Sequence, residues 1–367
     1  MTALVRFIWI LAILVPFNAI QAQFAPLKPG FNKLEYAEML KISSRQIDLP
    51  SESFKTPAPA YFTRNYQSKT MGLENRWELW TNATHSVAVI SIRGTTQNNT
   101  SLLENFYAAM VPAIGSLHLT DSLNFNYHLS NNPKAGIHIG WLIGTGFLIQ
   151  DMLPKIDSIY KKGIKNVLIM GHSQGGAIAY LLSSHLAYLQ ETNQLPKDIQ
   201  FKTYCSAAPK PGNLFYAYEY EKLMADGWGF NVVNTADWVP QCPLTVESLT
   251  DFNNTNPFIN ISSILKKQAF SKRVAMKYAF NQLNNPSIKT KKRYEKYLGN
   301  IAAKSIQKTL PEFAKPTYLK SFDYVRVGPT IVLLANQTYY QQFPDNPEKI
   351  FTHHFIDAYL FLTNQLN

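Results

Sequence analysis

Residues 166–176 read Asn-Val-Leu-Ile-Met-Gly-His-Ser-Gln-Gly-Gly, and this stretch decides how the rest of the chain is interpreted. Its first half, ending at Met170, is an apolar run typical of a strand buried on both faces. Residues 171–175 fit the pattern G-x-S-x-G, and the apolar residues from Ala177 to Leu182 predict a helix. A strand, a tight glycine turn and a helix together form the context in which a serine is displayed as a nucleophile.

The glycines of this turn have a physical reason. A serine on such a turn takes a strained backbone conformation, and only glycine fits where strand and helix backbones nearly touch. The turn also places the Ser173 hydroxyl at a helix N-terminus, where N–H groups favour developing negative charge. The alternative is a glycine-rich turn with an incidental serine, because a bare G-x-S-x-G match is weak. The partners found elsewhere in the chain favour the catalytic interpretation.

The N-terminus has the pattern of a secretory signal peptide. Residues 1–22 contain Arg6, an apolar run up to Ala19 and a small residue, Ala22, before the expected cut. The run is too short for a confident membrane span, so an uncleaved anchor is the lesser alternative. We therefore expect a secreted or periplasmic protein whose domain, residues 23–367, is rich enough in apolar residues for one large α/β core.

The net charge of +11 belongs to one segment. Between Ile261 and Lys308 there are twelve Lys and Arg residues against one acid, Glu295, so the remainder is formally neutral. We expect a basic helical insertion at about 245–320, with two helices separated near Pro286. It either holds the protein against an anionic lipid surface or, as the sequence favours, forms a solvated basic face over the core. Nucleic-acid binding is not expected, since no recognition motif is present.

Strands and helices alternate along the body of the chain. This order implies a mainly parallel sheet covered by helices on both faces. The expected strands lie at 77–81, 86–93, 166–170, 200–204, 230–233 and 324–334, and the expected helices at 31–46, 147–160, 177–182, 214–224 and 354–362.

A serine nucleophile needs a base, and the base needs an acid to orient it. Asp237 directly follows the strand at 230–233, where it can enter the crevice that contains Ser173, although a turn-capping role is the alternative. Only His353 and His354 follow Asp237 in the chain. One of them is the predicted general base, and the other is a surface or packing histidine.

Two backbone N–H groups are expected to bind the developing oxyanion. Gln174, directly after the nucleophile, supplies one. Thr95, which follows a buried strand and Arg93-Gly94, is the natural source of the other, and its hydroxyl can add a third donor.

At this point the sequence resembles the class 3, or fungal-type, lipases of the α/β-hydrolase fold. The resemblance runs from about Tyr36 to Tyr359 and leaves out the basic insertion. The matching motifs are Ile92-Arg93-Gly94-Thr95, His138-Ile139-Gly140-Trp141, Gly171-His172-Ser173-Gln174-Gly175-Gly176, Ala208-Pro209-Lys210-Pro211-Gly212-Asn213, Asn234-Thr235-Ala236-Asp237-Trp238-Val239-Pro240, and His354 followed by Tyr359.

The resemblance implies Ser173 as nucleophile, Asp237 as acid and His354 as base. It prefers His354 to His353 because family members place the base five residues before a tyrosine of the closing helix. It also implies that Thr95 belongs to the oxyanion hole. Two features depart from the family: Gln174 replaces the usual apolar residue, and the insertion places the acid and the base 117 residues apart.

The resemblance further implies that the segment at about 99–114 is a lid. Ser101-Leu-Leu-Glu104 fits a capping box that opens a helix. Its apolar side is expected to cover Ser173 in water and to turn toward lipid when open. The alternative is an ordinary amphipathic helix packed on the core. The residues expected on that side are Leu103, Phe106, Tyr107 and Met110.

The function expected from these features is that of a serine hydrolase. It cleaves carboxylic esters of lipids, as a triacylglycerol lipase does, through an acyl-enzyme on Ser173 and without a cofactor or metal. The alternatives within enzymes are a phospholipase or an esterase of soluble or feruloyl esters, and outside them a non-catalytic lipid-binding protein. Lipid contact through the lid and the insertion is expected. The sequence leaves open the oligomeric state and a disulfide between Cys205 and Cys242.

Overall fold

The computed structural model describes residues 26–47, 55–256, 258 and 265–366. The expected signal peptide, residues 1–22, lies outside these ranges. Within the described ranges, no helix has both the length and the apolar character that crossing a membrane requires.

The centre of the described structure is a seven-stranded sheet in the order β1-β2-β3-β8-β9-β10-β11. From β3 onward all neighbouring strands are parallel, whereas β1, β2 and β3 pair antiparallel. The mainly parallel sheet predicted from the alternating pattern is therefore confirmed. The strands are β1 (Phe62–Gln67), β2 (Trp77–Asn82), β3 (Val87–Ile92), β8 (Asn166–His172), β9 (Gln200–Ser206), β10 (Gly229–Asn234) and β11 (Thr330–Leu333).

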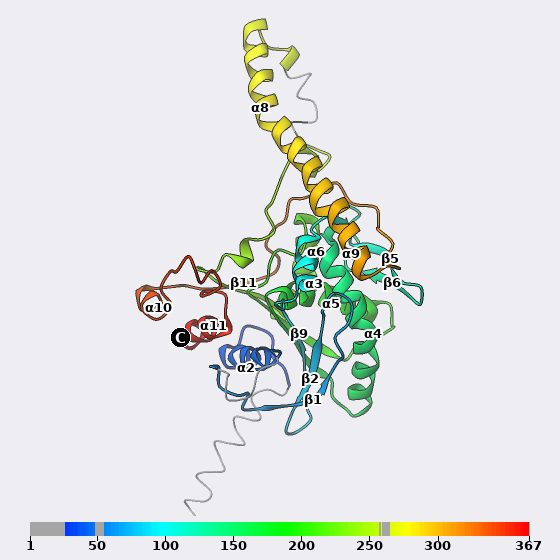
Figure 1. Ribbon diagram of the computed structural model, residues 1–367, viewed down its shortest axis with the longest axis vertical. Coiled ribbons are helices and arrows are strands. Elements are labelled where there is room, and N and C mark those ends of the chain that lie inside the picture. Colours follow the sequence, from blue (N-terminus) through cyan, green and yellow to red (C-terminus); the bar gives the residue numbers. More distant parts are fainter. Residues whose placement is uncertain (1–25, 48–54, 257, 259–264, 367) are drawn as a thin grey trace, which may run out of the picture.

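Helices cover both faces of this sheet (Figure 1). Because side chains alternate along a strand, Ile90 of β3 packs into one apolar core and Val89 into the other. The three-layer α/β arrangement of the predicted α/β-hydrolase fold is thus confirmed. The first core includes residues of α4 (Ile139–Lys161), α5 (Gln174–Glu191) and α6 (Leu214–Leu223), and the second includes residues of α2 (Lys33–Ser44) and α11 (Ile356–Asn364).

Helix α4 begins at Ile139, eight residues before the predicted start, and it continues through Gly140, Gly144 and Gly146 without interruption. A Cβ on Gly140 would lie 1.9 Å from the carbonyl oxygen of Glu104, and one on Gly144 would lie 2.5 Å from the Glu104 carboxyl. The glycines therefore let α3 (Asn99–Phe106) pack closely on α4.

Two small antiparallel pairs, which the sequence did not predict, lie between α3 and α4 in the chain. They are β4 (Met110–Pro112) with β7 (Gly136–His138) and β5 (Ile114–Thr120) with β6 (Leu123–His128).

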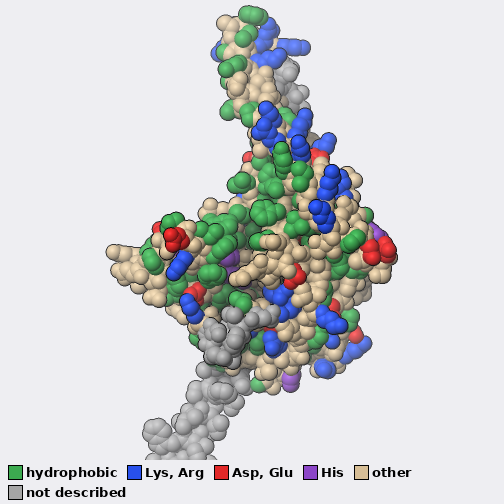
Figure 2. All heavy atoms as spheres, viewed as in Figure 1, with side chains coloured by type: hydrophobic (Ala, Val, Ile, Leu, Met, Phe, Trp, Pro, Cys, Tyr) green, Lys and Arg blue, Asp and Glu red, His purple; other side chains and the backbone are tan. Residues whose placement is uncertain are grey.

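The basic segment contains a long helix that leaves the body of the molecule. Helix α8 (Phe270–Tyr294) runs through Pro286, so the predicted break there is wrong. It projects away from the sheet, and Figure 2 shows basic and hydrophobic side chains exposed along it. Met276 and Leu283, apolar residues among the lysines of α8, are 41% and 79% exposed. The favoured interpretation, a basic face covering the core, is therefore wrong for α8.

The base of this segment does pack on the body. A π-helical stretch, Glu295–Ile301, joins α8 to α9 (Ala302–Thr309), which contacts α3. The Leu298 carbonyl oxygen accepts from Ala109 N at 3.2 Å, and Ile306 is fully buried. The projecting helix is thus anchored next to the segment that was predicted to be the lid.

The remaining elements are short. Only Thr330–Leu333 of the predicted 324–334 strands pairs in the sheet, and the closing helix begins at Ile356 rather than His354. Cys205 and Cys242 are free thiols, so they form no disulfide with each other. The other short helices are Ala225–Gly227, Val239–Gln241, Leu249–Asp251 and α10 (Gln337–Gln342).

Candidate active site

Ser173 lies on the tight turn that the sequence predicts. Ser173 lies between the last residue of β8 and the first residue of α5, with φ of 60° and ψ of −130°. This backbone conformation costs a non-glycine residue about 1–3 kcal/mol. A Cβ on Gly171 would lie 2.0 Å from the Gly175 carbonyl oxygen, and one on Gly175 would lie 2.3 Å from that of Ile92. Both glycines are therefore required by contact between backbones.

The two predicted oxyanion residues lie beside Ser173. A Cβ on Gly94 would be 3.5 Å from the Ser173 Cβ, which brings Thr95 to the turn. The Thr95 hydroxyl donates to Gln174 Oε1 at 2.9 Å, so their side chains are linked directly. Gln174 opens α5, and its N–H therefore belongs to the first turn, where helices have no internal acceptor.

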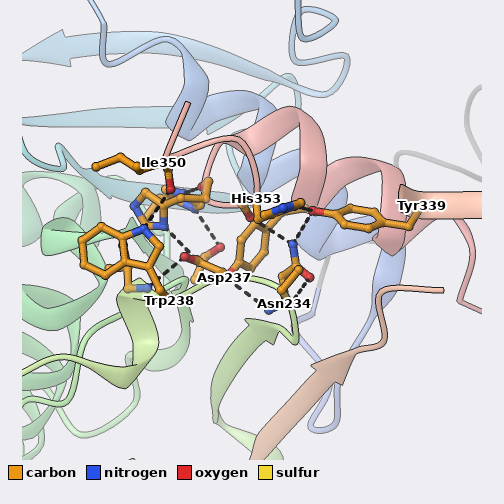
Figure 3. Close-up of polar contacts among 12 residues, drawn as sticks. Asn234, Asp237, Trp238, Tyr339, Ile350 and His353 are labelled. Atoms are coloured by element: carbon orange, nitrogen blue, oxygen red, sulfur yellow. Dashed lines mark hydrogen bonds and ion pairs between the residues drawn. The ribbon is translucent and has the colours of Figure 1, made fainter. Parts of the chain in front are cut away.

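Asp237 and His354 form a buried pair. Asp237 Oδ2 is 2.8 Å from His354 Nδ1, and the two residues are 3% and 7% exposed. The same Oδ2 accepts from the Tyr359 hydroxyl at 2.8 Å, and Oδ1 accepts from Val239 N at 2.9 Å (Figure 3). A carboxylate that accepts Nδ1–H leaves Nε2 of the imidazole free to take a proton.

His172 attaches the loop that carries His354 to the end of β8. Its Nε2–H donates to the His354 carbonyl oxygen at 2.7 Å, and its Nδ1 accepts from Ser206 Oγ at 3.0 Å. Burial, reinforced by His354, lowers the pKa of His172 to about 3, so its imidazole is neutral. The two imidazole rings are 5.0 Å apart, which places His354 beside the residue that precedes Ser173.

The second histidine of the pair has other partners. His353 Nδ1 accepts from the Tyr339 hydroxyl at 2.9 Å, and its Nε2 reaches the exposed Asp345 at 2.9 Å. Asn234 Nδ2 donates to Tyr339 and to the His353 carbonyl oxygen, as Figure 3 shows. The residue pattern left both histidines as candidates for the partner of Asp237, and in the structure His354 is the one that pairs with it.

Tyr359 has a larger role than its place in an apolar helix indicates. Its hydroxyl donates to Asp237 and accepts from Asn234 N at 3.1 Å, so it connects the acid to the end of β10. Periodicity alone marks this tyrosine as a core residue. Only the family spacing between His354 and Tyr359 pointed to it, and that spacing did not indicate the contact with the acid.

The predicted lid differs in three ways from the observed α3. Asn98, rather than Ser101, is the N-cap, and its side chain accepts from Thr100 N at 2.9 Å, so the capping-box prediction is wrong. The helix buries its polar residues, Ser101 and Glu104. The four residues predicted on one apolar side do not share a face. Leu103 is partly buried, whereas Phe106 is 61% exposed. Tyr107 is the C-cap of the helix and Met110 lies in β4, and both are fully buried.

Exposed aromatic residues lie near His354. The Phe351 ring lies 6.0 Å from the His354 ring and 5.5 Å from that of Trp238. Trp238 Nε1 donates to the Ile350 carbonyl oxygen at 2.8 Å, which joins the two loops across the site (Figure 3). Trp238, Ile350, Phe351 and Phe355 are 42%, 56%, 40% and 59% exposed, and such apolar surface marks binding sites more often than chance.

A family comparison agrees with this geometry. Residues 89–247 match the family model described as lipase (class 3). This segment is similar to the class 3 lipases. It contains Thr95, Ser173 and Asp237, and it ends before α8 and before His354. The predicted family is therefore confirmed over the part of the chain that carries the elbow.

Several solved fungal lipase structures are similar to the chain, whereas no curated protein matches it. A deletion mutant of Rhizomucor miehei lipase in complex with its propeptide is 19% identical, with a TM-score of 0.42; the match covers 59% of this chain and 64% of that one. Lipase II from Rhizopus niveus is 18% identical, with a TM-score of 0.41, over 58% and 75% of the two chains. Lip2 lipase from Yarrowia lipolytica is 15% identical, with a TM-score of 0.43, over 59% and 76%.

The contacts of Tyr359 predict that its hydroxyl supports the acid. Tyr359→Phe removes one donor to Asp237 and leaves Asn234 N–H without its acceptor, so we expect about 1–3 kcal/mol lower unfolding free energy. We also expect kcat on an ester to fall about tenfold, because His354 is then less firmly oriented. Tyr340→Phe, at a partly exposed hydroxyl, is the matched control. Equal behaviour of the two variants would contradict the assigned role.

The neutral His172 predicts a pH dependence of stability. The folded protein keeps this imidazole unprotonated down to a pKa of about 3, whereas the unfolded chain takes up a proton near pH 6.5. Acidification therefore favours unfolding, by about 1.4 kcal/mol per pH unit below ~6 for one such histidine. In urea titrations, the free energy of unfolding should fall less between pH 6 and pH 5 for His172→Gln than for the wild type. An unchanged slope would show that His172 is protonated in the folded protein.

Proposed function

We propose that the protein is a serine hydrolase that cleaves carboxylic esters of lipids through an acyl-enzyme on Ser173. The observation that carries the proposal is the buried hydrogen bond from His354 to Asp237, held by His172 beside the strained turn of Ser173. The match of residues 89–247 to the class 3 lipase family model supports ester hydrolysis as the reaction.

Each residue of the site has a defined part in this reaction. Ser173 Oγ attacks the acyl carbonyl carbon while His354 Nε2 accepts its proton. Asp237 orients His354 and stabilises its charged form. The backbone N–H groups of Thr95 and Gln174 donate to the oxyanion, and His354 then protonates the leaving alcohol. Water repeats the sequence on the acyl-enzyme and releases the acid.

The surroundings of the site favour a lipid ester over a soluble one. The exposed apolar residues at Trp238, Phe351 and Phe355 border the base and offer contact area to an acyl chain or to a lipid surface. A triacylglycerol is the substrate proposed first, with phospholipid and feruloyl esters as the alternatives to be compared. Export as a secreted or periplasmic protein belongs to the proposal and rests on the pattern of residues 1–22.

A fluorophosphonate probe and an ester panel test the proposal together. The wild type should be labelled at Ser173 and hydrolyse emulsified triacylglycerol faster than soluble short-chain or feruloyl esters. Ser173→Ala should lose labelling and about 10⁴-fold or more of kcat, whereas Ser158→Ala, an exposed serine on α4, should retain both. Undiminished hydrolysis by Ser173→Ala would overturn the proposal. A folded wild type that is neither labelled nor active would favour a non-catalytic lipid-binding protein.

The projecting helix α8 extends the proposal to the lipid surface. Between Phe270 and Tyr294 it carries basic residues and no acidic ones, and bulky apolar side chains are exposed among them. Phe270 and Tyr278 are 73% and 67% exposed. Lysines attract an anionic surface while apolar side chains insert into it, so we propose that α8 anchors the enzyme on negatively charged lipid.

Charge removal on α8 tests this anchoring. Each Lys or Arg near an anionic surface contributes about 1 kcal/mol, so Lys289→Gln, Lys292→Gln and Arg293→Gln together should weaken binding to vesicles of phosphatidylglycerol and phosphatidylcholine about 100-fold. Hydrolysis of a soluble ester should stay within about twofold of the wild type. The control is the equal charge change on the body, Lys69→Gln, Lys197→Gln and Lys222→Gln. An equal loss in both triple variants would contradict a specific role for α8.

A further inference from the structure

Glu104 is a buried carboxyl that the proposed reaction does not use. It lies on the inner side of α3, is fully buried, and its Oε2 accepts from Asn75 Nδ2 at 2.7 Å. Burial raises the pKa of Glu104 well above its ordinary value, and the side-chain amides of Asn75 and Gln174, which face the carboxyl, only partly oppose this. A fully buried carboxylate without a cationic partner is costly, so the neutral form is favoured.

Two oxygen atoms at this site are hydrogen-bond acceptors without a donor. Among the described residues, neither Glu104 Oε1 nor Asn75 Oδ1 has a partner that meets hydrogen-bond geometry. Both lie against Gly144 of α4: a Cβ there would be 2.5 Å from Oε1 and 3.0 Å from Oδ1. Two bare acceptors that border the same glycine in a closed interior are unfavourable, and one proton on Oε1 would satisfy both.

We propose that Glu104 carries a proton in the active enzyme and donates it in a hydrogen bond to Asn75 Oδ1. With the bond from Asn75 Nδ2 to Oε2, this makes a two-point pair between a carboxylic acid and an amide. The pair holds α3 against the body of the enzyme and thereby positions the oxyanion hole. Glu104 is on this view a positioning residue for the hydrolysis proposed above, and the inference rests on that function.

The path from Glu104 to the oxyanion hole is short. Asn105, the next residue, donates through Nδ2 to Thr95 Oγ1 at 3.0 Å and accepts from Trp141 Nε1 at 2.9 Å. Thr95 in turn donates to Gln174 Oε1 at 2.9 Å, and the amide of Gln174 also faces the Glu104 carboxyl. A shift of α3 therefore moves the side-chain contacts of both oxyanion residues.

The charged groups near α3 lie apart from this carboxyl. Helix α3 has no other ionisable residue, and α9, which packs on it, carries the exposed Lys304 and Lys308. Arg93, in the loop that leads to Thr95, pairs with Glu74 at 3.8 Å. At the start of α4, His138 donates through Nε2 to the Asn105 carbonyl oxygen at 3.2 Å, and burial lowers its pKa to about 3. The groups facing the Glu104 carboxyl are thus amides and neutral side chains.

The proton has a consequence at alkaline pH. Glu104 of the folded protein stays protonated at pH values where the same carboxyl of the unfolded chain is already ionised. The free energy of unfolding therefore falls as the pH rises beyond the ordinary carboxyl pKa. Ionisation of Glu104 places a carboxylate against the Asn75 carbonyl oxygen and loosens α3. We therefore expect kcat to decline when Glu104 ionises, with KM for a soluble ester little changed, because the oxyanion contacts act mainly in the transition state.

Four variants test the pair, with ester hydrolysis followed from pH 6 to pH 10. Glu104→Gln, whose amide imitates the protonated acid, should keep kcat within about threefold at pH 7 and lose the alkaline decline. Glu104→Ala and Asn75→Asp should each lower kcat about 10- to 100-fold, since loss of a full oxyanion donor costs about 10²–10³. Asn75→Asp combined with Glu104→Gln exchanges acid and amide and should restore most of the activity. Glu348→Gln, at an exposed site, is the control.

Infrared difference spectra between wild type and Glu104→Gln measure the proton without reference to activity. At pH 7 the wild type should have the carbonyl stretch of one protonated carboxyl that the variant lacks. Absence of this band, or a Glu104→Gln variant as impaired as Glu104→Ala, would overturn the inference. If the band is present but Ser173→Ala leaves hydrolysis unchanged, the proposed function fails instead, so the two failures are distinguishable.

Discussion

The strained turn at Ser173 is the constraint on which the rest of the site depends. A positive φ at a serine persists only where the surroundings allow no other conformation. Gly171 and Gly175 let β8, α5 and β3 approach until their backbones touch, and Gly94 brings the loop after β3 to the same place. One close approach of three backbone segments thus displays Ser173, the proposed nucleophile, and places the proposed oxyanion residues beside it.

The separation of the acid and the base along the chain matters little, because the sheet brings them together. Parallel strands end at the same edge, so the residues after β8 and β10 meet there. The basic segment leaves after β10 and returns before β11, which pairs with β10 along its length. His172 and Tyr359 then fasten His354 and Asp237 to this edge. The long insertion therefore alters the outside of the molecule and not the catalytic pair.

Local patterns in the sequence predicted what local physics determines. The apolar runs before Ser173 and Asp237 form strands as expected, and the chain order of the site residues follows from the parallel sheet. Predictions failed where packing overrides propensity. Gly140 and Gly144 precede the helix expected at 147–160, yet they lie inside α4 and make room for Glu104. Pro286 lies inside α8, and an N-cap at Asn98 rather than a capping box at Ser101 begins α3.

The predicted apolar face of the lid segment was wrong for a related reason. Periodicity assigns the apolar side of a helix to the interior, but α3 buries Ser101 and Glu104 and exposes Leu102 and Phe106. Hydrogen bonds hold such a helix and require specific partners such as Asn75 and Trp141, while Leu103 adds apolar contact with the core. Leu102 and Phe106 take no part in these hydrogen bonds and stay exposed. The polar side chains that anchor α3 and the apolar side chains that it exposes are thus different residues of one short helix.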